Sequence, residues 1–418
     1  MKVLLKQARI ICTGSPQHGK VQDILVVNGL IEKIAGQISV EADETIQSDN
    51  LHVSPGFTDI FSHFTDPGFE HRETLESGAA AAAAGGYTDV FVLPNTNPPV
   101  SIKSQVEYIC QKSLQLPVNI HPIGSVTKNA EGKELAEMYD MYASGARVFS
   151  DGIQPIQHPG VMLKGLQYVL SKEAMVIQLP DDKALSPHGL MNEGIVSTRL
   201  GLPGKPAIAE ELMIARDIEL LKYTGSKLHI TGVSTRKGME MILAAKAAGL
   251  NISFSVTPYH AYFCDEDLAG YDTNLKVNPP LRTREDMMAV RNAITEGLAD
   301  CIASHHIPQH WDDKTCEFEY AKNGMASLEA VFGVVNSFSP SAEVLVKMLA
   351  ENPRRITGLT IPEIIEGSNA CLTIFDPTVN VTFDESMIRS RSRNYAFIGK
   401  ELKGRILGII NGDKTTIN

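Results

Sequence analysis

Short apolar runs alternate with stretches of helical periodicity through the central part of the chain. From residue 56 to about residue 310, each run ends in polar residues or in Gly and Pro. This alternation is typical of a parallel α/β architecture, because a helix must return the chain to the start of the next parallel strand. The runs predict strands at residues 57–63, 88–93, 119–126, 146–150, 174–178, 227–233, 251–256 and 300–304.

Helical stretches lie between the predicted strands, most clearly at residues 73–84, 210–222, 236–248 and 284–296. Eight strand–helix units in about 250 residues match a (β/α)8 TIM barrel. In such barrels the loops that follow the strands form the active-site face. We therefore expect functional side chains in polar segments such as 94–97 and 257–260.

The two ends of the chain have a different pattern. Residues 3–54 and the residues from 369 onward form short β-like stretches, with a turn signal at Asn28 and Gly29. Two terminal β segments that flank a barrel can bury their apolar faces by pairing with each other. The sequence predicts a barrel over residues 55–360 and a small composite β-sandwich from residues 1–54 and 361–418.

Composition and charge indicate where the protein works and which kinds of partner it does not bind. The 418 residues carry a formal net charge of -11, whereas a nucleic-acid-binding surface needs clustered Lys and Arg. No segment approaches the roughly 18 continuous apolar residues that would span a bilayer. The apolar start at residues 1–6 is not followed by a small-residue cleavage site. We expect a cytoplasmic protein with no nucleic-acid or membrane partner.

The six cysteines have no paired spacing, which indicates reduced thiols rather than a zinc knot or a redox pair. They are Cys12, Cys110, Cys264, Cys301, Cys316 and Cys371.

Two motifs carry most of the chemical information, at residues 55–68 and 302–308. They resemble the amidohydrolase superfamily and, within it, the dihydroorotases, which open or close a pyrimidine ring. Dihydroorotases show Asp-x-His-x-His-x-Arg-Glu-Pro-Gly at the first motif and Ala-Thr-Asp-His-Ala-Pro-His at the second. Further similarity at residues 70–74, 85–88, 94–99, 191–194, 276–282 and 394–405 extends the resemblance over nearly the whole chain. Segments 94–99 and 276–282 favour dihydroorotase over hydantoinase or allantoinase.

The resemblance implies a binuclear metal site at the carboxyl ends of strands one, four, five, six and eight, but most of its ligands are replaced. On strand one, Phe61 stands at the first metal His and His63 at the second. On strand four, Asp151 matches the bridging Asp of one dihydroorotase group. The other replacements are Gln178 for the strand-five His, Gly232 for the strand-six His, and His305 for the strand-eight Asp that also serves as general base.

These replacements remove both metal binding and proton transfer. A hydrolytic zinc needs about three protein ligands and an open position. Phe and Gly cannot ligate, and Gln is a poor substitute for His. Thr65 stands where the family has the Arg that pairs with a substrate carboxylate. We therefore expect no cofactor and no catalysis of the family's reaction. The vestigial substrate pocket would comprise Thr65, Asn95, His260 and Asn278.

Several of these residues also have a purely structural interpretation. His63 can simply be hydrogen-bonded at its strand end, and Asp151 can accept bonds from neighbouring backbone N–H groups. Asn95 and Asn278 match family residues that contact the dihydroorotate ring, but they can equally hold their own loops through side-chain to backbone bonds.

A rebuilt metal site is the opposite alternative. His305, His306 and His310 can in principle join His63 in a different zinc site. Trp311, just after strand eight, belongs either to packing at the barrel mouth or to a subunit contact.

Three functional hypotheses follow. The first is a non-catalytic dihydroorotase homologue that acts as a structural or regulatory partner of aspartate carbamoyltransferase, since some bacterial carbamoyltransferases assemble with an inactive dihydroorotase-like subunit. The second is a cyclic-amide hydrolase with altered chemistry and a rebuilt or reduced zinc site. The third is a weak or partner-activated dihydroorotase. We expect a homo-oligomer, a dimer by preference, because closed symmetric dimers are the commonest soluble oligomers.

Overall fold

Eight parallel strands form a closed barrel in the computed structural model, which describes residues 1–172 and 174–418. Hydrogen bonds join β6, β7 and β8 in one run and the remaining barrel strands in another. Parallel bridges from Gly124 to Phe149 and from Ser62 to His306 connect the two runs at both ends. The expected (β/α)8 fold is confirmed. The barrel strands are β6 (Phe57–Ser62), β7 (Tyr87–Val92), β8 (Asn119–Pro122), β9 (Val148–Phe149), β10 (Met175–Gln178), β13 (Leu228–Ile230), β14 (Ile252–Val256) and β15 (Cys301–Ile302).

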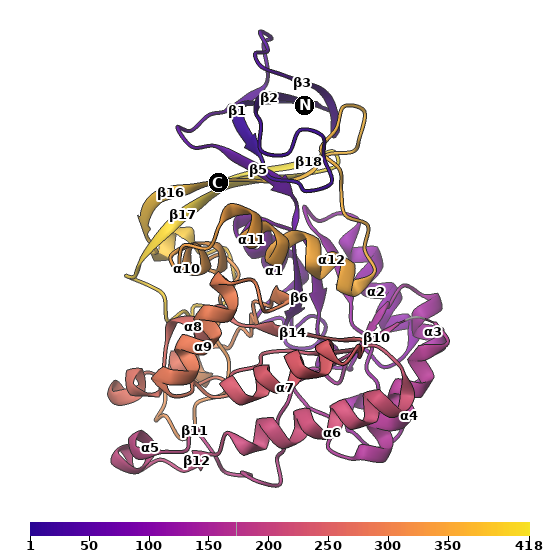
Figure 1. Ribbon diagram of the computed structural model, residues 1–418, viewed down its shortest axis with the longest axis vertical. Coiled ribbons are helices and arrows are strands. Elements are labelled where there is room, and N and C mark those ends of the chain that lie inside the picture. The colour runs from indigo at the N-terminus through magenta and orange to yellow at the C-terminus, as the bar shows by residue number, and fades with distance from the viewer. Residues whose placement is uncertain (173) are drawn as a thin grey trace.

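Helices cover the outside of the barrel, and α4, α6 and α7 lie side by side against it in Figure 1. Helix α1 consists mostly of Ala and packs on β7. A Cβ at Gly78 in this helix would stand 2.6 Å from the ring of Phe64, so small residues permit the close approach. The helices are α1 (Leu75–Ala84), α2 (Lys103–Ser113), α3 (Met138–Ala143), α4 (Pro159–Leu170), α5 (Ile195–Leu200), α6 (Ile208–Thr224), α7 (Arg236–Ala247), α8 (Pro258–Tyr262), α9 (Arg284–Thr295), α10 (Val331–Asn336), α11 (Ala342–Val346) and α12 (Asn352–Thr357).

The barrel interior is filled with side chains. One buried apolar cluster comes from residues on or just after β6 to β10 and β15, and it includes Ile60, Phe61, Phe91, Ile177 and Ala303. A larger cluster fills the layer between the strands and the surrounding helices. The centre of the barrel is therefore a packed core, as is usual for this fold.

The two ends of the chain form one eight-stranded sheet at one end of the molecule, where Figure 1 shows both termini. Ser54 pairs with Thr373, which confirms the predicted pairing of the terminal segments. β1 pairs with β4 through Val3–Leu5 and with β5 through Arg9–Ile10, and the sheet has its own buried apolar cluster. The strands are β1 (Lys2–Ile10), β2 (Val21–Val27), β3 (Leu30–Ala35), β4 (Glu44–Ile46), β5 (His52–Pro55), β16 (Cys371–Thr382), β17 (Glu401–Asn411) and β18 (Lys414–Ile417).

Two excursions reach the carboxyl ends of the barrel strands. The first contains β11 (Met191–Asn192), α5 and β12 (Gly204–Lys205). The second is residues 384–397, where Glu73 accepts a bond from the backbone N–H of Arg391 at 3.0 Å and Glu329 accepts one from that of Ser390 at 3.0 Å. The remaining short elements are η1 (Lys128–Ala130), η2 (Asp265–Gly270), η3 (Thr273–Leu275), η4 (Trp311–Asp313), η5 (Lys347–Glu351) and η6 (Glu385–Met387).

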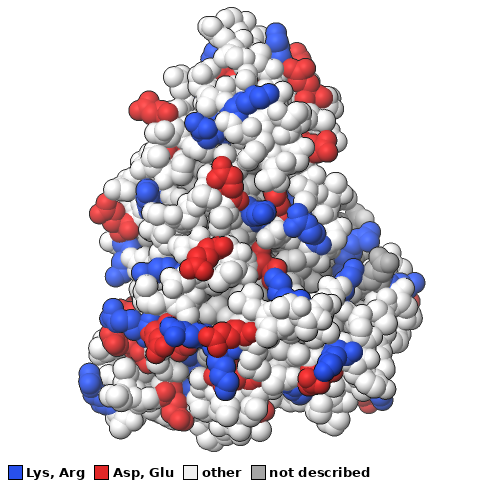
Figure 2. All heavy atoms as spheres, viewed as in Figure 1, with Lys and Arg blue, Asp and Glu red and all other residues white. Residues whose placement is uncertain are grey.

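Positive and negative side chains are interleaved over the face of the molecule drawn in Figure 2. Some join neighbouring helices, as Lys237 and Glu211 do at 2.8 Å. Across the described ranges, none of the helices has the length and apolar character that a bilayer crossing requires.

Candidate functional site at the barrel mouth

Phe61 lies just before the end of strand β6 and packs on His305 inside the barrel. The two ring centroids are 4.3 Å apart and the rings are inclined by 27°. Both side chains are fully buried. The position at which the resemblance puts the first metal His is therefore filled by an aromatic stack.

His305 follows strand β15 as a buried imidazole with a positive φ of 44°. Its Nε2 lies 2.7 Å from Thr231 Oγ1, and its Nδ1 has no partner among the residues that the structure describes. Burial and then the neighbouring His260 and His229 hold the pKa of His305 well below its usual range. The ring is therefore neutral at neutral pH. It lies in a buried aromatic stack and not in a water-filled cleft, where a general base would have to act.

Gly232 lies beside the same ring. Its φ is +68°, and a Cβ there would stand 2.5 Å from His305 Cε1. A side chain at residue 232 would need the space that the imidazole occupies. Phe61, Gly232 and His305 are thus one packed unit, and each replacement accommodates the others.

His63 is held by the loop after β7. Its Nε2 donates to the backbone oxygen of Asn95 at 2.9 Å, and burial lowers the pKa of His63 to about 4. Asn95 in turn donates through Nδ2 to the carbonyl of Asp151 at 3.0 Å and accepts through Oδ1 from the N–H of Ile153. The structure gives His63 and Asn95 the loop-holding roles that the sequence left open.

Asp151 is also satisfied internally. Its Oδ1 accepts from the N–H of Thr127 at 2.9 Å and its Oδ2 from the hydroxyl of the same residue. Burial raises the pKa of Asp151 to about 6. The carboxylate holds the loop after β8 to the end of β9.

Gln178 and His229 form hydrogen bonds with other residues of the protein. Gln178 exchanges hydrogen bonds with the backbone of Ile156, at 3.2 Å and 3.4 Å. His229 contacts Ser253 Oγ through Nδ1 at 2.8 Å and Ser255 Oγ through Nε2 at 3.0 Å. Burial lowers the pKa of His229 to about 3. Both side chains have local structural roles.

Thr65 and His260 hold loops at the mouth. Thr65 Oγ1 lies 2.8 Å from the carbonyl of Phe69 and 2.9 Å from that of Glu73. His260 Nε2 donates to the carbonyl of Pro279 at 3.0 Å, and burial lowers the pKa of His260 to about 3. Neither side chain is among those that line the cavity at the barrel mouth.

The four histidines of the alternative zinc site point to different partners. His306 accepts through Nδ1 from the N–H of Ser327 at 3.0 Å, and its Nε2 lies 3.3 Å from Glu73. His310 lies beside the His71 ring at 5.6 Å and contacts Asp312 at 3.2 Å. Although the His63 N–H donates to the carbonyl of His306 at 2.8 Å, the side chains of these four histidines form no metal-binding group in the described part of the chain.

The donor set does not suit the zinc that the family resemblance implies. Phe61 and Gly232 have no donor atom, and His63 and Asp151 direct theirs to the protein. Among residues 1–172 and 174–418, no group of three or more His, Cys, Asp or Glu side chains is arranged to hold a metal ion. Accordingly, no step routed through a metal can be derived from these residues.

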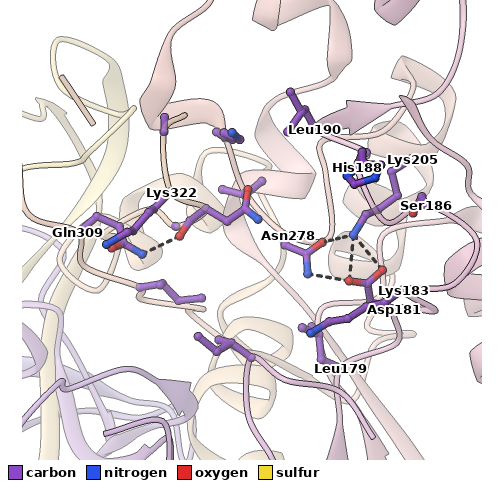
Figure 3. Close-up of a pocket in the computed structure, with 18 of the residues that line it drawn as sticks. Leu179, Asp181, Lys183, Ser186, His188, Leu190, Lys205, Asn278, Gln309 and Lys322 are labelled. Atoms are coloured by element: carbon purple, nitrogen blue, oxygen red, sulfur yellow. Dashed lines mark hydrogen bonds and ion pairs between the residues drawn. The ribbon is translucent and has the colours of Figure 1, made fainter. Parts of the chain in front are cut away.

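A cavity of about 1060 Å³ opens above this packed layer. Lys205 Nζ lies 2.9 Å from both carboxylate oxygens of Asp181 and 2.9 Å from Asn278 Oδ1, and Asn278 Nδ2 donates to Asp181 at 3.1 Å. Figure 3 shows these three side chains converging at the cavity wall, with Lys183 and His188 nearby. Of the predicted pocket residues, Asn278 alone is in the lining.

Lys205 was not predicted from the sequence. It lies on β12, in the excursion between β10 and α6, and it reaches Asp181 only because that excursion folds back over the mouth. The acidic pair at residues 181 and 182 was the one signal that could have indicated a charged cluster here.

Comparison with known proteins agrees with this framework. The sequence model of the family described as Dihydro-orotase-like matches residues 51–238. A protein named dihydroorotase from Pelotomaculum thermopropionicum is 39% identical over 100% of this chain and 99% of its own length. Another of that name from Geobacter metallireducens is 39% identical over 99% of both chains.

Solved structures show the same fold. An L-hydantoinase (dihydropyrimidinase) from Arthrobacter aurescens superposes with a TM-score of 0.83 at 22% identity, covering 100% of this chain and 97% of the other. A dihydropyrimidinase from Brevibacillus agri gives 0.82 at 17% identity, covering 100% and 95%. With full-length relatives at 39% identity and this barrel, the chain belongs to the dihydroorotase family of the amidohydrolase superfamily.

Proposed function

We propose that this chain is a dihydroorotase-family protein of pyrimidine biosynthesis that does not hydrolyse dihydroorotate and that acts as a structural or regulatory partner of aspartate carbamoyltransferase. The observation that carries the proposal is the packed unit of Phe61, Gly232 and His305. It fills the place where the family's chemistry needs ligands and an open coordination position.

The lost chemistry has two parts. Water attack on a cyclic amide requires an activated water and a group that moves its proton to the leaving nitrogen. His305 is neutral, buried and stacked, and His63 already donates its Nε2 proton to a carbonyl. Neither imidazole lines the cavity in which a substrate would sit.

The scaffold has been kept while the site has changed, which supports selection for assembly. Arg354 on α12 is buried, donates to the carbonyl of Gly56 and pairs with Asp89 on β7, so the barrel remains tied to the terminal sheet. A partner that recognises the outer surface requires this framework and not the catalytic groups. Self-association as a dimer is compatible with the same role.

The assembly role is tested by separating the pocket from the surface. The full-length protein should co-elute with aspartate carbamoyltransferase from the same organism. His63→Ala and Asp151→Ala variants, if folded, should leave the partner's activity unchanged, whereas deletion of the whole protein should impair assembly or activity. If the pocket variants alone abolish the role, or if no complex forms, the proposal fails.

A cyclic-amide hydrolase with altered chemistry is the second candidate. The observation that favours it is the cavity of about 1060 Å³ with the cluster of Lys205, Asp181 and Asn278 in its wall. Such a convergence of polar groups is a usual feature of ligand sites. In this case Lys205→Met should abolish turnover of a cyclic amide, while partner assembly stays intact.

A further inference from the structure

A second cavity, of about 420 Å³, lies beside the barrel mouth and is not part of the site described above. Its wall combines the loop after β6, the segment after β15 and the C-terminal excursion. The lining side chains relevant here are His71, His310, Trp311, Lys314, Arg391 and Arg393.

The wall is cationic in a chain whose net charge is -11. None of the described residues that line it carries a carboxylate. Of the acids beside the cavity, Asp312 contacts the lining residue His310 at 3.2 Å, whereas Asp313 pairs with Lys322 at 2.7 Å and with Arg72 at 3.4 Å. Within the described residues, the guanidinium of Arg391 has no hydrogen-bond or ion-pair partner. Charge of one sign gathered around a hollow attracts a counter-ion.

Two titrating groups in the wall have lowered pKa values, for which burial is the first cause and neighbouring positive charge the second, while Asp313 acts in the opposite direction on both. Burial and then the adjacent Lys276 lower the pKa of Lys314 to about 7, although Lys314 Nζ donates to the carbonyls of Thr273 and Lys322 at 2.8 Å. Burial and then the positive charge of Arg72 lower the pKa of His71.

Trp311 adds a planar surface to the cationic wall. It is the only tryptophan in the chain, and 70% of it is exposed. An indole left in water beside a cavity presents a face on which an aromatic ring can stack. The guanidinium groups of Arg391 and Arg393 line the same cavity and are suited to phosphate oxygens; Arg393 Nη1 also donates to the carbonyl of Ile388 at 3.2 Å.

We propose that the cavity formed by His71, Trp311, Arg391 and Arg393 binds a nucleoside phosphate, with the base on Trp311 and the phosphate on the two arginines. The volume is within the range of small-molecule sites, about 300–1,000 Å³. The site goes beyond the proposed assembly role and does not depend on it.

Trp311 itself supplies the readout. The full-length protein is titrated with uridine 5′-monophosphate and, separately, adenosine 5′-monophosphate while its tryptophan fluorescence is followed. Saturable quenching by either nucleotide is expected. Uridine and inorganic phosphate, tested separately, should bind at least about tenfold more weakly, since each lacks one of the two contacts.

Matched variants assign the binding to this cavity. Arg391→Ala combined with Arg393→Ala should raise the Kd about tenfold or more. Arg389→Ala is the control, since its guanidinium donates to the carbonyl of Ser386 and lines a different groove. Calorimetry of Trp311→Ala, an exposed substitution, gives a second measure and should also show weaker binding. Absence of saturation, equal quenching by uridine, or an unchanged Kd in either variant would overturn the proposal.

Discussion

Three residues beneath the barrel mouth constrain one another. The Phe61 ring stacks on His305, and His305 in turn occupies the space into which any Cβ at residue 232 would project. The effects of substitutions at these three positions on the unfolding free energy should therefore not be additive, as expected for residues in direct contact.

Gly232→Ala should be more destabilising than its backbone strain alone explains. Gly201 has nearly the same φ, +70°, but open space around its Cβ, so Gly201→Ala is the matched control. We expect a loss of about 1–2 kcal/mol in the control from left-handed strain. Gly232→Ala should lose about 2–4 kcal/mol because overpacking is added. Urea unfolding measures both, and the difference should vanish in a His305→Ala background; equal losses in the native background would contradict the packed unit.

Partial repair of the motif should not restore catalysis. In the double variant Phe61→His with His305→Asp, Gln178, Gly232 and Thr65 still lack the family's groups. Residues of a catalytic site act as a unit, so we expect dihydroorotate hydrolysis below about 10⁻³ of that of a family member with the full motif. Substantial recovery from two changes would mean that the loss is shallower than proposed.

At the residue scale, the sequence predicted which positions had changed but not what the new side chains do. Phe61 and His305 are 244 positions apart in the numbering, so their stacking could only be seen once the barrel closed. The ion pair of Lys205 with Asp181 was likewise not predictable, because the two residues come together only when the excursion that contains β12 folds over the barrel mouth. Asp151 also differs in its partner: the sequence suggested neighbouring backbone N–H groups, whereas the carboxylate accepts from the N–H and hydroxyl of Thr127 on the loop after β8.

At the scale of elements, all eight predicted barrel strands are present because each is an apolar run bounded by polar residues. Several are shorter than predicted: β9 and β15 have two residues each, and their runs continue as irregular segments. The excursion with β11, α5 and β12 was not predicted, because its elements have two to six residues and show no sustained periodicity.

One buried ion pair joins elements from distant parts of the chain. Arg354 on α12 donates to Asp89 on β7 and to the carbonyl of Gly56. Against the effect of burial, Arg354 and His121 hold the pKa of Asp89 below its usual range.

Arg354→Leu should cost about 3–5 kcal/mol of unfolding free energy, because it leaves Asp89 buried without its charge partner. Adding Asp89→Asn should recover part of that loss. The control is Arg284→Leu, whose pair with Glu266 is exposed and contributes little because solvent screens it. Equal effects of Arg354→Leu and Arg284→Leu in urea unfolding would refute this account of the junction.

At the scale of the whole molecule, the buried histidines make stability depend on pH. Burial lowers the pKa to about 4 for His63 and to about 3 for His229 and His260, from 6.5 in the unfolded chain. Asp151 and Asp217 act oppositely, because burial raises the pKa of each to about 6.

The unfolding free energy should fall by about 3 kcal/mol between pH 7 and pH 5. As the pH drops below 6.5, these histidines become protonated in the unfolded chain but stay neutral in the folded protein. This stabilises the unfolded state by about 2 kcal/mol for each of the three histidines at pH 5. The two aspartates together return about 3 kcal/mol, since the folded state protonates them first. Urea unfolding at the two pH values measures the change; equal or greater stability at pH 5 would show that these histidines are not buried in neutral form.

The central claim is that the packed unit of Phe61, Gly232 and His305 excludes metal-assisted hydrolysis. The most direct test measures zinc content and dihydroorotate hydrolysis on one preparation of the full-length protein purified without chelator. We predict well under one zinc per chain and no hydrolysis above the uncatalysed rate, including after addition of zinc. One zinc per chain coordinated near His63, together with turnover, would contradict the account.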